Sequence, residues 1–362
     1  MNLRAGAKIW IHTAVALSLL ALWSGIGRAD TLEQCGNNEE CLRQAHVSHA
    51  VKSADYWRAF NALPIDRRIL VASTKLLDYL NLDNHLNGFP NRPRAAKPPR
   101  QFTRDLRDAV SQLPAPVLRL VDSRLMGIYL VEDLGGTGFT DYVYDEQGDP
   151  AGAFVVLDTG VLTQAANRWA TWKENTPFIA EAGIELQAVI ENAENDDVKQ
   201  ALQFIVLHEF GHVASVGRQI HPRWDAWDCV SDPPERYPYL VLSWQLAGGE
   251  GCRLISTFDR TGFGYRTDVV YYFGAELPAS VSPEVYAQLE QTNFPSLYAS
   301  TSPADDFAEA FAIYVHAKMM GKPFSITIDS EGRRETRFTA CWDSARCAAK
   351  QEILTALLAG GE

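Results

Sequence analysis

Two histidines and a glutamate interrupt an otherwise apolar stretch, ALQFIVLHEFGHVASVG, at residues 201–217. Burying ionisable groups is costly unless they are paired or bound to a metal. His208 and His212 are four residues apart, so on a helix both imidazoles project from one face and can bind one ion. Glu209 lies beside them. This H-E-x-x-H spacing is typical of sites where two imidazoles bind Zn²⁺ and the glutamate takes a proton from the attacking water.

The same stretch carries signals for a helix that begins near residue 197 and ends near residue 217. Asp196 or Asp197 can cap its start, and Gly217 can end it. Gly211 lies inside the helix, where glycine costs about 1 kcal/mol relative to alanine, so we expect a close neighbour there. The simpler alternative is a pair of core histidines, which would need a hydrogen-bond partner for each ring nitrogen.

A catalytic zinc site of this kind needs a third protein ligand. Residue 218 is Arg218, so the longer motif with three histidines is excluded. The histidines at 46, 49 and 85 lie far away in the N-terminal part. The best source of a carboxylate is LYASTSPADDFAEAF, where Asp305 and Glu309 are four residues apart and share one helical face.

HEFGH followed by FAEAF resembles the gluzincin metallopeptidases, most closely the lethal-factor type, although only these two motifs carry the resemblance. The resemblance implies that Asp305 is the acidic zinc ligand, that Glu309 orients a ligand histidine, and that Tyr298 assists the reaction. The family has a glutamate where this chain has Asp305. Because the aspartate side chain is shorter, either the second helix lies closer to the metal or Glu309 is the ligand.

Each of these residues also has a structural interpretation. Ser302 and Asp305 resemble a capping box, in which the carboxylate reaches back to the Ser302 N–H. Tyr298 can be a packing residue with a wet hydroxyl. Asp306 points away from the shared face and is expected to be solvated, and His316 is expected to be a packed or surface residue.

Three apolar segments predict strands before the HEFGH helix: GIYLVED (127–133), FTDYVYDE (139–146) and GAFVVLD (152–158). The turn signals between them favour a meander, and we take GAFVVLD as the edge strand that would pair with a substrate. Periodicity predicts a helix within residues 64–82, with Asp66 at its start. It also predicts helices at about 160–173, 178–193 and 303–320. The fold class predicted is α+β, a zincin-like domain with a small sheet, an active-site helix and a helical C-terminal part.

The chain divides into three predicted parts. Residues 1–29 combine a basic start, an apolar core and small residues before Asp30, which indicates a signal peptide cleaved near Ala29; an uncleaved anchor is the alternative. Residues 30–100 form a helical segment that ends in a Pro/Arg-rich linker, 89–101. Residues 101–362 form the catalytic domain, with an aromatic-rich insert at 218–297 that either walls the cleft or packs on itself.

Six cysteines fall in sequence-adjacent pairs after the predicted signal: 35 with 41, 229 with 252, and 341 with 347. In an exported chain, periplasmic or secreted, this favours disulfides over free thiols. The net charge of −12 argues against nucleic acid and anionic membranes as partners.

The expected function is therefore an exported zinc metallopeptidase acting on protein or peptide, with His208, His212 and Asp305 as ligands and Glu209 as general base. One alternative is an exported binding or scaffolding protein that retains zinc for structure, which would leave Glu209 without a purpose. The other is a zinc hydrolase of a cell-wall or other non-protein amide, which would use the same residues.

Overall fold

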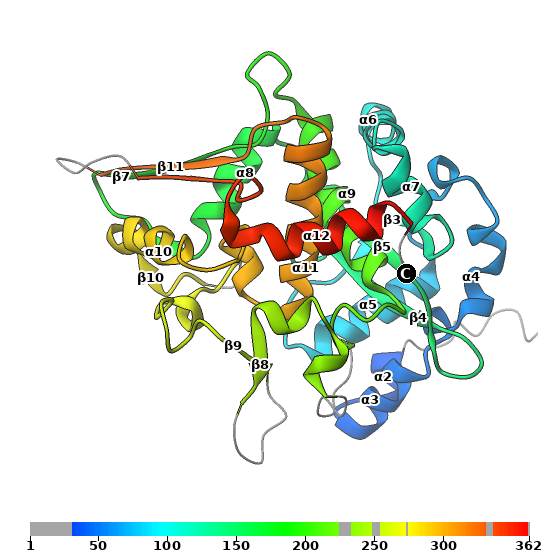
Figure 1. Ribbon diagram of the computed structural model, residues 1–362. Helices are drawn as coiled ribbons and strands as arrows, with labels where there is room; N and C mark the ends of the chain where they lie inside the picture. The colour runs from blue at the N-terminus through cyan, green and yellow to red at the C-terminus, as the bar shows by residue number, and fades with distance from the viewer. Residues whose placement is uncertain (1–30, 224–232, 248–253, 273, 331–335, 361–362) are drawn as a thin grey trace, which may run out of the picture.

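A mixed sheet occupies the centre of the fold in the computed structural model, which describes residues 31–223, 233–247, 254–272, 274–330 and 336–360 (Figure 1). β3 (Leu125–Glu132) and β5 (Pro150–Asp158) lie next to each other and run parallel. β1 (Ile69–Val71) pairs in parallel with β3, and β4 (Gly138–Tyr144) pairs antiparallel with β5. β4 is consequently an edge strand.

The predicted strands at 127–133, 139–146 and 152–158 are present, but the meander is wrong. Residues of β3 and β5 are buried almost throughout, as expected for central parallel strands covered on both faces. β4 is only partly buried, which suits an edge. The expectation that GAFVVLD forms the edge is wrong for the same reason, because β5 has a neighbour on each side.

Helices cover both faces of this sheet. Along β3, Ile128 and Leu130 point into a core shared with α9 and α11, whereas Tyr129 and Val131 point into a second core beneath the N-terminal helices. This alternation is the period of two that a strand imposes. The helices on the first face are α6 (Arg100–Ser111), α7 (Ala115–Asp122), α8 (Ala166–Asn175), α9 (Val198–Ser215) and α11 (Pro303–Ile313). Those that supply the second core are α4 (Ala54–Asn61) and α5 (Thr74–Leu86).

The N-terminal part contributes strands to the main sheet as well as helices that cover it. Its first helices are α2 (Thr31–Cys35) and α3 (Glu39–Val47). The prediction of a helix that begins at Asp66 is wrong, because Ile69–Val71 forms β1 and α5 begins only after Ser73. The Ser73 side chain accepts a hydrogen bond from the Leu76 amide and caps α5. Within the segment 89–101, β2 (Arg94–Ala95) pairs antiparallel with β3.

The helix predicted at 178–193 is also wrong. Residues here form β6 (Phe178–Ile179) and β7 (Ile184–Val189), separated by Gly183 at φ +80°. In β7 buried and exposed residues alternate, which is a strand period rather than a helical one. The helix predicted at 160–173 is present but begins later, as α8.

β7 joins β11 (Ser325–Ser330) and β12 (Thr336–Thr339) in a smaller antiparallel sheet that extends away from the centre (Figure 1). The helix predicted at 303–320 is confirmed as α11 followed by a π-helical turn, Tyr314–Met319. The remaining elements are β8 (Trp244–Leu246), β9 (Leu254–Ser256), β10 (Leu277–Pro278), α10 (Ser282–Leu289) and α12 (Ala348–Leu358).

Two of the three expected disulfides, Cys35–Cys41 and Cys341–Cys347, are present. Cys229 and Cys252, like the predicted signal peptide at 1–29, lie outside the described residues. None of the helices in the described ranges is long and apolar enough to cross a membrane.

Candidate metal centre

α9 carries the HEFGH motif through the middle of the fold, side by side with α11 (Figure 1). Asp197 caps its start by accepting a hydrogen bond from the Gln200 amide, and Gly217 follows its end at φ +65°, as the sequence predicts. His208 and His212 keep 13% and 12% of their side-chain surface exposed. Their Nε2 atoms lie 3.2 Å apart.

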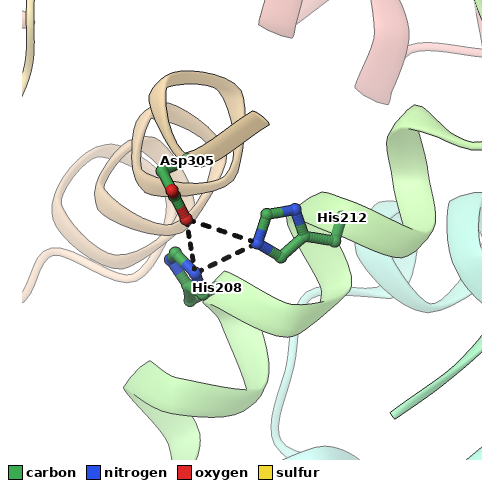
Figure 2. A group of neighbouring side chains, drawn as sticks. All are labelled: His208, His212 and Asp305. Atoms are coloured by element: carbon green, nitrogen blue, oxygen red, sulfur yellow. Dashed lines mark hydrogen bonds and ion pairs between the residues drawn. The ribbon is translucent and has the colours of Figure 1, made fainter. Parts of the chain in front are cut away.

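Asp305 from α11 completes a triangle with these two nitrogens, which Figure 2 shows. Its Oδ1 atom lies 3.8 Å from Nε2 of His208 and 3.7 Å from Nε2 of His212. Tetrahedral ligands at the usual Zn²⁺ distances lie about 3.4 Å from one another. The donor set and its spacing therefore fit a zinc ion, and no other group of three such side chains converges in this way within the described part of the chain.

The short aspartate reaches this position because α9 and α11 approach closely. A Cβ atom built on Gly211 would lie 2.7 Å from Cα of Ala308, so the two helices meet where Gly211 has no side chain. The close neighbour that we expected at Gly211 is confirmed.

Asp305 also takes part in the cap of α11. The Ser302 hydroxyl accepts from the Asp305 amide at 3.0 Å and donates to Oδ2 of Asp305 at 2.7 Å. Thr301 donates to the same Oδ2 atom. The carboxylate thus contacts the Ser302 hydroxyl instead of the Ser302 N–H that a capping box predicts. One of its oxygens is held at the helix start while the other faces the histidines, so a part in the cap does not prevent Asp305 from facing them.

Glu309 lies one turn further along α11, on the outer side of His208. Its Oε1 atom is 3.0 Å from Nδ1 of His208, and its Oε2 atom accepts from the Ser296 hydroxyl at 2.6 Å. Burial would raise the pKa of Glu309, but the charge of Lys173 and the hydrogen bond from His208 lower it to about 2. An ionised Glu309 that accepts from Nδ1–H leaves the Nε2 lone pair of His208 facing the triangle.

Glu209 is buried beside the triangle and faces β4. The Thr140 hydroxyl donates to its Oε2 atom, and burial raises the pKa of Glu209 above its usual range. A Cβ atom on Gly138 would lie 2.2 Å from Oε1 of Glu209, so a side chain at position 138 would force this carboxylate to move. The start of the edge strand therefore fixes the position of Glu209.

Tyr298 packs its ring against His208, with the ring centroids 5.6 Å apart. Burial, followed by the negative charge of Asp305, raises its pKa well above the usual range, so the hydroxyl stays protonated and able to donate. Tyr272 belongs to the aromatic insert, and its ring centroid lies 6.0 Å from that of Tyr298. Both tyrosines line the same cavity. Tyr272 adopts φ +68°, a conformation that is rare for a side chain of this size.

A cavity of about 660 Å³ opens over these residues. Residues 134–141, which run into β4, form one wall, and Asp83, Asn84 and Asn87 of the N-terminal part form another. The cavity therefore continues from the triangle along the edge strand towards α5. An extended chain laid beside β4 would pass next to Glu209.

Sequence reasoning missed three residues at this site: Thr140, Lys173 and Tyr272. None of them has a spacing relative to HEFGH that marks it, and Tyr272 is one of many aromatic residues in the insert. The prediction that Asp306 is solvated is wrong, because this residue is fully buried and paired with Lys350. His316 is packed, as expected, with Nε2 2.7 Å from the Ile190 carbonyl oxygen.

Comparisons of this chain with protein-family models, with curated proteins and with solved structures found no match.

Proposed function

We propose that this protein is an exported zinc metallopeptidase that hydrolyses peptide bonds. The observation that carries the proposal is the convergence of Nε2 of His208, Nε2 of His212 and Oδ1 of Asp305 at 3.2–3.8 Å, with Glu209 beside them in a cavity. Two disulfides in the described ranges and the apolar N-terminal sequence support export. The zincin-like fold is part of the same proposal.

Each residue has a distinct role in this mechanism. When bound, zinc polarises the scissile carbonyl and lowers the pKa of water. Glu209 takes the proton from the attacking water and passes it to the leaving amine. Tyr298 donates a hydrogen bond to the developing oxyanion. Glu309 orients His208 through Nδ1.

The edge strand β4 offers the backbone surface on which an extended peptide can pair. Thr140 and Gly138, both on β4, touch Glu209, so a peptide paired there would have its backbone beside the general base. This arrangement favours a protein or peptide over a compact substrate. A hydrolase of a cell-wall amide uses the same residues and is the second candidate, while a purely structural zinc site gives no role to Glu209 or to the cavity.

The test is zinc analysis of the purified protein together with a peptide-library digest read by mass spectrometry. We expect one zinc per chain in the wild type, loss of zinc in His208→Ala, and retained zinc in Glu209→Gln with hydrolysis slowed by about 10²–10⁴-fold. Absence of zinc from the reconstituted wild type would refute the proposal. Cleavage of peptidoglycan fragments, with no cleavage of peptides, would favour the second candidate.

A further inference from the structure

Lys173 of α8 is a buried cation that the mechanism above does not use. Only 4% of its surface is exposed, and its Nζ atom lies 3.1 Å from Oε1 of Glu309 and 3.6 Å from Oε1 of Glu174. A lysine is almost never buried to this extent without paired charges. Its partners here are two carboxylates, one of which already contacts His208.

Oε1 of Glu309 serves two donors at once. It is 3.0 Å from Nδ1 of His208 and 3.1 Å from Nζ of Lys173. A carboxylate oxygen has two lone pairs and can accept from both donors at once. The ammonium group of Lys173 is therefore held at the same oxygen that orients the imidazole.

Lys173 also lies beneath the ring of Tyr298. Its Nζ atom is 4.6 Å from the ring centroid, which is within the range of a cation–π contact. The same ring packs on His208. One lysine therefore contacts both the carboxylate that orients His208 and the tyrosine that covers it.

Lys173 is itself held in place by the aromatic insert. Glu174, its neighbour in α8, accepts hydrogen bonds on Oε2 from the hydroxyl of Tyr271 at 2.8 Å and of Tyr286 at 2.7 Å. Both tyrosines belong to the segment 218–297 and are buried. The insert is thus fastened to α8 at the residue next to Lys173, rather than packing only on itself.

We propose that Lys173 is a positioning residue of the metal centre: it holds Glu309 so that His208 presents Nε2 to zinc, and Glu174 with Tyr271 and Tyr286 fixes Lys173 in turn. This inference rests on the proposed zinc site. It assigns the aromatic insert a part in metal binding, through a chain of contacts that runs from Tyr271 and Tyr286 to His208.

The decisive measurement is the zinc dissociation constant of Lys173→Met, obtained by competition with a chromophoric chelator. Loss of a partner that supports a ligand histidine weakens metal binding by about 10–100-fold, and we expect a change of that size. Lys173→Gln keeps a donor but loses the charge, so it serves if the methionine variant does not fold, and we expect about 10-fold weaker binding. Lys173→Arg keeps the charge and is expected to bind more tightly than either.

The Co²⁺-substituted protein gives a second readout that does not depend on catalysis. Its visible absorption bands report the ligand geometry, and we expect them to shift in Lys173→Met. The matched control is Lys350→Met, which removes another buried lysine, paired with Asp306 of α11 instead of Glu309. We expect its bands and zinc affinity to match those of the wild type.

The outcomes separate this inference from the zinc proposal itself. A wild type that binds zinc, with Lys173→Met and Lys173→Gln both within about twofold of it, would overturn the role of Lys173 and leave the zinc site standing. An equal loss of affinity in Lys173→Met and Lys350→Met would also overturn it, because the effect would then come from general destabilisation. A wild type without zinc would refute the proposed function instead.

Discussion

Asp305 and Asp306 are neighbours in α11, yet they face two very different polar clusters. Asp306 is fully buried, and its carboxylate contacts the ammonium group of Lys350, the hydroxyl of Tyr239 and the indole N–H of Trp244. Every one of these groups is a donor. The cluster around Asp306 is therefore satisfied by the protein alone, as buried polar groups in a stable core usually are.

The cluster around Asp305 is built differently. Oδ2 accepts from Ser302 and Thr301, but Oδ1 faces the two imidazole nitrogens across 3.7–3.8 Å, which is too long for hydrogen bonds. About 21% of the Asp305 side chain remains exposed to the cavity. Oδ1 of Asp305 thus converges on the two imidazole nitrogens without a hydrogen bond to either, which leaves room for a ligand between them, whereas the donors around Asp306 pair with its carboxylate directly. The two adjacent aspartates therefore differ in whether the protein alone satisfies them.

The largest effect is expected from Asp306→Ala, because it leaves Lys350 buried without its partner. Breaking a buried ion pair in this way costs about 3–5 kcal/mol. We expect a loss of that size in the free energy of unfolding, measured by urea denaturation of the metal-free protein. Asp306→Leu combined with Lys350→Met removes both charges and is expected to restore most of the loss. A single variant that loses less than about 1 kcal/mol would contradict the structural role of Asp306.

Asp305→Ala is expected to behave in the opposite way. The unfolding free energy of the metal-free protein should change by no more than about 1 kcal/mol, the size of a charge effect at a helix start. Loss of an orienting residue weakens zinc binding by about 10–100-fold, and Glu309→Gln is the variant that measures this loss. We expect Asp305→Ala to weaken zinc binding by more than Glu309→Gln does. If Glu309→Gln abolishes zinc binding and Asp305→Ala retains it, then the ligand is Glu309 and the contrast between the two aspartates fails.

The sequence was sufficient for the parts of this site that depend on local spacing. His208, Glu209 and His212 lie within one turn of α9, and the predicted cap at Asp197 and glycine at 217 mark where that helix begins and ends. Asp305 and Glu309 share a face of α11 for the same reason. A period of 3.6 residues fixes such relationships without knowledge of the rest of the fold.

Relationships between distant residues could not be predicted in this way. Lys173 and Glu309 are separated by 136 residues, and they meet only because α8 and α11 both pack against α9. The order of β3, β5 and β4 depends on long-range pairing, which turn signals alone do not encode. Asp306 looked solvated because its partner Lys350 lies in α12, beyond the reach of helical periodicity.

The smallest effect, and the sharpest test of the contrast, is expected at Ser302, which contacts both the start of α11 and the Asp305 carboxylate that faces the two histidines. Ser302→Ala removes the cap, and we expect about 1 kcal/mol less stability towards urea. It also removes the donor to Oδ2 of Asp305, so zinc affinity should fall, though by less than about 10-fold because Thr301 still donates. Ser73→Ala, at the cap of α5, should lose similar stability with unchanged zinc affinity. Equal zinc affinities in the two variants would mean that Ser302 only caps the helix and that the order of Asp305 comes from elsewhere.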